Sequence, residues 1–122
     1  MKYSISIILP ILNEINSLKK TLQILNKIKV DKEFIVIYSN KLTQDLVKDE
    51  IHSLKKKYKN LKCLKQIRPF VGGAIDLGIR NAKKNYIALM ASDMETNPYE
   101  LKNMINVSSK NNNSIISADR WI

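Results

Sequence analysis

The sequence predicts an α/β fold, in which a parallel sheet is covered by helices on both faces. Short apolar runs typical of buried strands alternate with longer segments whose apolar residues recur every three or four positions, as on one face of a helix. Strands separated by such helices form βαβ units, which build a parallel sheet. The chain has 122 residues and shows no repeat, linker or low-complexity segment. We therefore expect one domain over residues 1–122.

Five segments are predicted to be strands, because each is a short run rich in Ile, Val or Leu. They are residues 3–9, 33–38, 61–67, 86–91 and a fifth strand that starts at Ile115. Pro10 is expected to end the first strand, and Lys62 and Lys65 make the third the least apolar. The common order 3-2-1-4 is expected for the first four strands, with the fifth added to the same sheet.

Four helices are predicted between these strands. The segments that predict them are residues 15–28, 47–58, about 72–83 and the stretch after Pro98. Thr43 is expected to cap the second helix, and Gly72 and Gly73 to open the third. The fixed φ of Pro98 suits the first turn of the fourth helix. The residues expected to face inward from that helix are Leu101, Met104, Ile105 and Ser108.

Charge and reactive residues limit the classes of function. The formal net charge is +10, from 21 basic and 11 acidic residues, which suits phosphorylated ligands, an anionic membrane or nucleic acid. No zinc-finger spacing or RNA-recognition motif is present, so nucleic acid is not expected as a partner. Cys63 and His52 are single residues of their kind, which leaves little basis for a disulfide or for Ser-His-Asp or Cys-His chemistry. The lysine run at residues 55–59 predicts a solvated helix face, with anionic lipid as its alternative contact.

The candidate site lies where the first and fourth strands end. In an open α/β sheet, ligands bind beyond the carboxyl ends of the strands, where the strand order changes direction. The first strand runs into residues 10–14 (PILNE) and the fourth into residues 91–95 (ASDME). Asp93 and Glu95, two positions apart, can project to one side of an extended segment and hold Mg²⁺ or Mn²⁺, which prefer oxygen ligands and bridge nucleotide phosphates. The alternative is a pair of carboxylates on an exposed loop.

The glycine motifs of other phosphate-binding folds are missing. Residues 71–74 (VGGA) open a predicted helix, but no G-x-G-x-x-G and no Walker lysine signature is present. A dinucleotide-dependent oxidoreductase or a P-loop enzyme is therefore not expected. A receiver-type or flavodoxin-like domain is not favoured either, because the acidic residues stand after the wrong strands. Bound phosphates would be held through a metal ion.

In this order and spacing, the landmarks resemble the amino-terminal half of family 2 glycosyltransferases of the GT-A fold. Residues 5–14 (ISIILPILNE) resemble the family opening V-S-V-I-I-P-x-Y-N-E, and residues 33–38 match E-I-I-V-V-D except at the last position. Residues 71–82 (VGGAIDLGIRNA) resemble the G-x-G-x-A-x-x-x-G-x-x-x-A helix, and residues 86–89 (YIAL) resemble the Y-I-A-F strand. The resemblance covers essentially the whole chain.

The resemblance implies a Rossmann-like domain that takes part in inverting transfer of a sugar from a nucleoside-diphosphate sugar. The residues it assigns to nucleotide binding are Pro10, Leu12, Glu14, Tyr38, Ser39, Gly73, Asp76, Ser92 and Asp93. It assigns a divalent cation, Mg²⁺ or Mn²⁺, to Asp93 and Glu95, where the metal would neutralise the leaving nucleoside diphosphate. It assigns no catalytic base within this chain.

Residues 91–98 are most similar to the D-A-D-L-x-x-x-P stretch of polyprenyl-phosphate sugar transferases, and residues 117–121 are similar to their later G-S-R-[YW] segment. This similarity implies a glycan or polyprenyl-phosphate acceptor and a role in cell-envelope glycan biosynthesis. It further implies a cytoplasmic location, with peripheral contact at the inner face of the membrane.

The chain departs from the family pattern in three places, one of them two residues long. Tyr38 and Ser39 stand in place of Asp-Asp after the second strand, so the usual carboxylate contact to the base is absent. Ala91 replaces the first acidic residue of D-x-D, and Glu95 is expected to restore part of that charge. Asn85 stands in place of glycine, a mild change because Asn tolerates left-handed turns. These departures keep open an alternative, a non-catalytic fragment that binds a nucleotide or docks a partner.

The end of the chain carries a further expectation. Family members of this type continue through an acceptor-binding half, so the chain is expected to be truncated. The strand that runs into Trp121 would then leave an apolar edge, which predicts self-association into a homo-oligomer.

Overall fold

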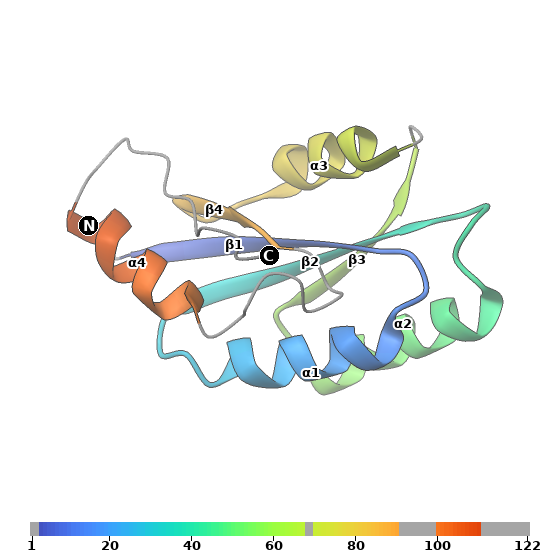
Figure 1. Ribbon diagram of the computed structural model, residues 1–122, viewed down its shortest axis with the longest axis horizontal. Coiled ribbons are helices and arrows are strands. Elements are labelled where there is room, and N and C mark those ends of the chain that lie inside the picture. Colours follow the sequence, from blue (N-terminus) through green and yellow to red (C-terminus); the bar gives the residue numbers. More distant parts are fainter. Residues whose placement is uncertain (1–2, 68–69, 91–99, 111–122) are drawn as a thin grey trace, which may run out of the picture.

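A computed structural model describes residues 3–67, 70–90 and 100–110 of the chain. Its strands and helices alternate along the sequence, which confirms the predicted α/β class (Figure 1). The elements are β1 (Ser4–Ile11), α1 (Ile15–Asn26), β2 (Asp31–Ser39), α2 (Asp45–Lys57), β3 (Leu61–Gln66), α3 (Phe70–Asn81), β4 (Tyr86–Leu89) and α4 (Glu100–Lys110). None of the described helices is long and apolar enough to cross a membrane.

The four strands form a parallel sheet in the predicted order β3-β2-β1-β4. β1 is central and apolar along most of its length: it pairs with β2 from Ser4 to Ile11 and with β4 from Ile5 to Ile8. β2 begins two residues before its predicted start, and β4 ends at Leu89. The predicted fifth strand, at residue 115, lies outside the described residues.

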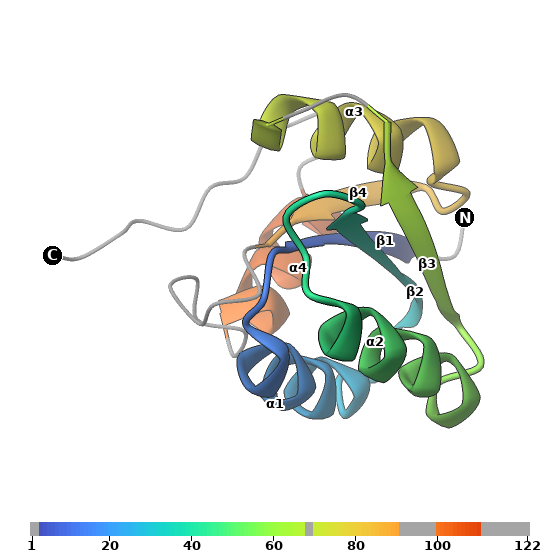
Figure 2. The same cartoon turned by 90° about the vertical axis from the view of Figure 1, so that its right-hand side faces the viewer.

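The helices cover both faces of the sheet. α1 and α2 lie side by side on one face with α4 beside them, and α3 lies on the other face (Figures 1 and 2). Side chains of β1 alternate between the two layers: Ile7 and Leu9 pack toward α1, α2 and α4, whereas Ile8 packs toward α3. Leu101 and Ile105 of α4 join the larger cluster, as predicted. The side chain of Ser108 lies outside the described residues.

β1 extends two residues beyond its predicted end, through Pro10 to Ile11. Met90 donates its N–H to the carbonyl oxygen of Ile8 at 3.0 Å. Backbone groups of successive residues in a strand point to alternate neighbours, so those of Ile8 and Pro10 both face β4. The N–H group that Pro10 lacks would therefore have faced β4 and not β2. β1 therefore keeps its pairing with β2 as far as Ile11, and the prediction that Pro10 ends the strand was wrong.

Thr43 does not cap α2, contrary to the prediction. The N-cap residue is Gln44, and no side chain caps the helix. The Thr43 hydroxyl instead accepts the N–H of Ser39 at 3.0 Å, while the Thr43 N–H donates to the Ser39 carbonyl oxygen at 3.1 Å. Thr43 is thereby buried in the loop that leaves β2, and closing that loop takes the hydroxyl away from the helix.

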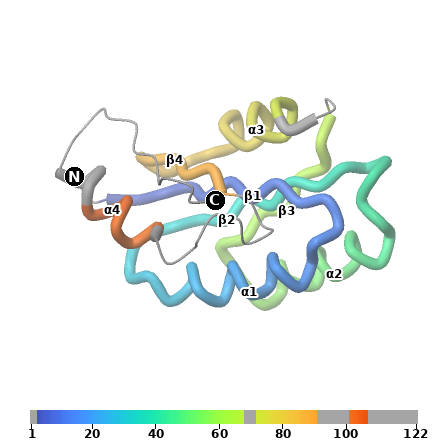
Figure 3. The backbone as a smooth tube through the Cα atoms, viewed as in Figure 1, coloured from blue at the N-terminus to red at the C-terminus, as the bar shows by residue number. Residues whose placement is uncertain are grey.

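α3 begins at Phe70 and ends at Asn81, so it starts and stops two residues earlier than predicted. Gly72 and Gly73 are consequently its third and fourth residues and do not open it. A different glycine sets its distance from the sheet: a Cβ on Gly78 would lie 2.6 Å from Cγ2 of Ile8. α3 can therefore approach β1 closely only because residue 78 has no side chain. Figure 3 follows this part of the backbone as a tube.

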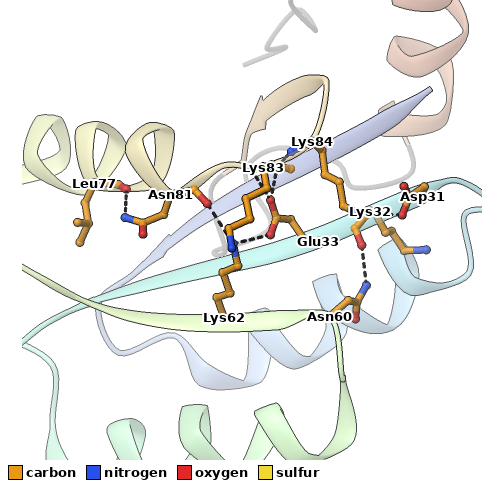
Figure 4. Close-up of polar contacts among 10 residues, drawn as sticks. Asp31, Lys32, Glu33, Asn60, Lys62, Leu77, Asn81, Lys83 and Lys84 are labelled. Carbon is orange, nitrogen blue, oxygen red and sulfur yellow. Dashed lines mark hydrogen bonds and ion pairs between the residues drawn. The ribbon is translucent and has the colours of Figure 1, made fainter. Parts of the chain in front are cut away.

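A polar cluster at the amino ends of the strands explains where α3 stops. The buried carboxylate of Glu33 accepts the Ser6 hydroxyl at 2.6 Å and the Lys83 N–H at 2.7 Å (Figure 4). Lys62 completes it with an ammonium group 2.8 Å from the same carboxylate. The next two N–H groups of the turn donate to serine hydroxyls of β1, Lys84 to Ser6 and Asn85 to Ser4. These partners replace the helical hydrogen bonds that would have continued α3.

Candidate functional site

The edge of the sheet at which the site is predicted lies where β1 and β4 end. β1 lies between β2 and β4, so the chain connections run to opposite sides of it, which is the arrangement that opens a crevice in doubly wound sheets. Met90, the last described residue before the acidic motif, is bonded to β1 at Ile8. The sheet order therefore brings the end of β4 beside β1, as the sequence predicted.

The turn from β1 into α1 is closed by Glu14. This residue is the N-cap of α1, and its carboxylate accepts the N–H of Leu12 at 2.8 Å and the N–H of Asn13 at 3.2 Å. Its carbonyl oxygen accepts the first helical hydrogen bond, from Leu18, at 3.0 Å. A carboxylate that binds the backbone of its own turn fixes the shape of that turn. Pro10 is half-buried at the end of β1, whereas the Leu12 side chain is exposed.

Asn13 joins this turn to the loop that follows β2. Its side-chain N–H donates to the carbonyl oxygen of Leu42 at 3.2 Å, and its side-chain oxygen accepts the N–H of Gln44 at 2.8 Å. Both polar ends of one amide are thus used by backbone groups 29 and 31 residues away. We call this pair of bonds the Asn13 clamp. Sequence reasoning missed it: an amide between two predicted site residues was the only signal, and its partners lie on a distant loop.

Ser39 ends β2 and closes the same loop. Its hydroxyl accepts the N–H of Leu42 at 3.1 Å, and its backbone bonds to Thr43 in both directions. The Lys48 ammonium adds a bond to the carbonyl oxygen of Asn40 at 2.7 Å. The loop that carries predicted residue Ser39 is therefore held from within and, through the Asn13 clamp, from the neighbouring turn.

Tyr38 lies on the α2 side of the sheet. Its ring meets that of His52 edge to face, with centroids 5.9 Å apart, and packs against the larger core cluster. Burial, followed by the nearby Cys63 thiol, raises the pKa of the Tyr38 hydroxyl. The hydroxyl is thus neutral and available for hydrogen bonding near pH 7. His52 is exposed, and the three lysines at the end of α2 are exposed as predicted.

The two predicted site residues of α3 lie on the other face of the sheet. Gly73 is half-buried in the first turn of α3, and Asp76 follows in the next turn. The Asp76 carboxylate pairs with Arg80 one turn along the helix, 2.9 Å from its Nε. Asp76 is therefore part of an exposed helical ion pair, and only Gly73 lies near the start of the helix that follows β3.

The acidic motif lies outside the described residues, and with it the predicted site residues Ser92, Asp93 and Glu95. Within residues 3–67, 70–90 and 100–110, no three side chains of His, Cys, Asp or Glu are grouped so as to hold a metal ion. The described part of the site thus consists of two connected backbone turns with Pro10, Glu14 and Ser39.

Comparison with known protein families matches residues 6–122 to the family described as glycosyl transferase family 2. The match includes β1 from residue 6 onward, the clamped turn, the loop after β2 and the acidic motif. Comparison with curated proteins found no match.

Proposed function

Because the chain belongs to glycosyl transferase family 2, we propose that it binds a nucleoside-diphosphate sugar at the carboxyl ends of β1 and β4 and supplies the donor half of an inverting transfer. The observation that carries the proposal is the Asn13 clamp, which holds two backbone turns together beside the point where the strand order reverses. Preformed turns at that point lower the ordering cost of binding a flexible ligand. The resulting edge fits the family activity, which is sugar transfer.

In the proposed complex, the turn at residues 10–14 and the end of β2 contact the nucleoside. Ser39 and Tyr38 replace two acidic residues of the family pattern, so the base would be bound by neutral groups. The Tyr38 hydroxyl, whose pKa is raised by burial, remains a donor at neutral pH. Gly73 leaves room for the ligand beside the start of α3. Asp76, paired with Arg80, would bind a ligand only after that pair opens.

Asp93 and Glu95 would hold a divalent cation, and Ser92 would take part in nucleotide binding. Their carboxylate oxygens are the donors that Mg²⁺ and Mn²⁺ prefer. A bound cation would supply positive charge that stabilises the leaving nucleoside diphosphate. Ala91 contributes no ligand, so this two-carboxylate site would bind the metal more weakly than one with a third acidic residue.

The acceptor oxygen would attack the anomeric carbon as the bond from that carbon to the diphosphate oxygen breaks, with inversion. A polyprenyl phosphate already carries an anionic oxygen and needs no base, whereas a glycan hydroxyl must lose its proton to one. The similarity of residues 91–98 to polyprenyl-phosphate sugar transferases favours a polyprenyl phosphate in the cytoplasmic leaflet, and with it a role in cell-envelope glycan biosynthesis.

Calorimetric titration tests the proposal. UDP, GDP and a sugar nucleotide are titrated into the 122-residue chain with and without Mn²⁺. We expect one diphosphate to bind only with the metal, Asp93→Ala to abolish that binding, and Glu95→Ala to weaken it. Asp49→Ala is the control, because it removes an exposed carboxylate of α2 and changes the net charge equally. Absence of binding by the parent chain would reject the proposed donor site, and parental affinity in both acidic-motif variants would reject the metal assignment.

One observation favours a second function, a fragment that binds nucleotide without transferring sugar. The Ser39 hydroxyl and N–H are both used inside the loop, at a position where the family pattern has a free carboxylate. Ala91 removes another polar contact. Metal-dependent nucleotide affinity without release of sugar or transfer to any lipid phosphate would support this reading.

A further inference from the structure

Exposed aliphatic side chains follow three adjacent strands at the carboxyl edge of the sheet. Leu12 comes directly after β1 and is 45% exposed, and Ile67 comes directly after β3 and is 83% exposed. Between them, the loop and first helical turn after β2 carry Leu42 and Leu46, which are 67% and 77% exposed. The Asn13 clamp holds the turn that carries Leu12 against the loop that carries Leu42, and Ile67 follows the neighbouring strand β3 at the same carboxyl edge. We call these four residues the aliphatic edge.

The aliphatic edge is held in its exposed position by the backbone. The Leu42 N–H donates to the Ser39 hydroxyl and its carbonyl oxygen accepts the Asn13 side chain. The Leu12 N–H donates to the Glu14 carboxylate. These bonds fix the backbone from which both side chains project. Fixed exposure of several large aliphatic residues in one place is unusual on a soluble surface and marks a contact surface.

Two exposed lysines flank the aliphatic edge. Lys41 and Lys65 are exposed beside Leu42 and Ile67. Of the acidic side chains on the same segments, Glu14 is bonded to its own turn, and Asp45 has the Lys48 ammonium 3.7 Å away. The whole chain carries a formal net charge of +10. At the opposite edge, Glu33 is buried and bonded to Lys62, so the two ends of the sheet differ in character.

From these observations we propose that the aliphatic edge docks on the surface of an anionic phospholipid bilayer. Leu42, Leu46 and Ile67 enter the interfacial zone while Lys41 and Lys65 contact lipid phosphates, which combines the two terms that bind proteins to such surfaces. Docking in this orientation turns the carboxyl ends of the strands toward the lipid headgroups. The inference does not rest on nucleotide binding, because the surface is present without a ligand.

Vesicle flotation tests the docking surface without any nucleotide. The parent chain is mixed with vesicles of phosphatidylcholine alone or with phosphatidylglycerol. We expect binding to the anionic vesicles, reduced about tenfold by the double variant Leu42→Ser, Leu46→Ser, because two partly inserted aliphatic side chains are lost. The matched control is the double variant Ile79→Ser, Ile87→Ser, which removes aliphatic side chains that are 47% and 46% exposed on α3 and β4. It should bind within about twofold of the parent, by the same principle.

Three outcomes would overturn the proposal. The first is a parent chain that floats with neither vesicle. The second is equal binding of the leucine variant and the parent, which would leave only nonspecific attraction of a basic protein. The third is a lipid-free dimer in sedimentation equilibrium that the leucine variant dissociates, since the aliphatic edge would then be a protein interface. Because no nucleotide is present, each outcome is independent of the calorimetric test of the donor site.

Discussion

Replacement of Glu33 by alanine offers the sharpest test of how the sheet is held together. The carboxylate is 7% exposed and lies 2.8 Å from the Lys62 ammonium, so it is a buried charge with one cationic partner. It also accepts the Ser6 hydroxyl and the Lys83 N–H. Truncation to alanine removes all three interactions at once and leaves their donors without this acceptor.

The expected loss follows from burial. Removing one member of a buried ion pair costs about 3–5 kcal/mol, because the remaining charge is uncompensated. Lys62 is 32% exposed and can regain water, which places Glu33→Ala near the lower limit, at about 3 kcal/mol. This is a large fraction of the roughly 5–15 kcal/mol that stabilises a domain. Glu33→Gln keeps the volume and one acceptor, so it should cost less, about 1–2 kcal/mol.

The pH dependence gives a second readout of the same carboxylate. Burial alone would raise the pKa of Glu33, but the hydrogen bonds from Lys62, Ser6 and Lys83, with the Lys62 charge, outweigh it and lower the pKa below its ordinary value. A lowered folded pKa stabilises the fold fully above the unfolded pKa, near 4.5, and this contribution is lost as the pH falls through the folded pKa. The parent should therefore lose stability below this pH more steeply than Glu33→Ala or Glu33→Gln.

Urea unfolding followed by circular dichroism measures the loss of stability at pH 7 and, when repeated at lower pH, its dependence on pH. The control is Asp31→Ala, whose carboxylate is 42% exposed and pairs with Lys84 at 3.1 Å. An exposed pair of this kind contributes about 0–1 kcal/mol. The assigned role would be refuted if Glu33→Ala lowered the free energy of unfolding by less than about 1 kcal/mol at pH 7. It would also be refuted if the variant lost stability at low pH as steeply as the parent.

Four further predictions concern the site, two glycines of α3 and the Cys63 thiol. Asn13→Ala should weaken nucleotide binding about tenfold in calorimetry, since it removes two hydrogen bonds of about 1 kcal/mol each. The control Asn60→Ala removes a similar bond at the amino edge and should leave the affinity unchanged. If Asn13→Ala binds nucleotide as tightly as the parent, the proposed role of the clamp is wrong. Gly78→Ala should lower the free energy of urea unfolding by about 1–3 kcal/mol, because its Cβ would meet a buried isoleucine. Gly72→Ala, with nothing within 4 Å, should raise it by up to about 1 kcal/mol. Burial raises the pKa of Cys63 from 9.0 to about 11, so alkylation at pH 8 should be about 100-fold slower than in urea, and a native thiol that reacts at the unfolded rate would show that it is accessible.

The sheet could be predicted from the sequence because its signals are local. Apolar runs and helical stripes fixed the number, type and order of the eight described elements. The ends of the elements depended on tertiary partners. Pro10 stayed within β1 because its missing donor faces away from β2, and Thr43 closed a loop instead of capping a helix. No local pattern carries that information.

The candidate site could be predicted in outline for a related reason. The expected strand order is confirmed, and it places the motif at residues 10–14 at the carboxyl end of β1, beside β4. Asn13 was missed because its partners are 29 and 31 residues away in sequence. The exposure of Leu42 and Leu46 was not predicted either, because an apolar residue next to a helix start is usually part of the core. The assignments at Asp93 and Glu95 remain predictions.

The serine hydroxyls at the amino edge also constrain the order in which this chain can fold. The hydroxyls of Ser4 and Ser6 accept hydrogen bonds from backbone N–H groups that lie 81 and 78 positions later in the sequence. The Glu33 carboxylate accepts one from an N–H group 50 positions later. Contacts of such wide sequence separation form slowly, because a long loop must close before they are made. During synthesis, the first two strands can meet well before the turn after α3 has emerged from the ribosome. Until that turn has formed, the Glu33 carboxylate must stay hydrated. The amino edge should therefore be the last part of the sheet to lose its bound water.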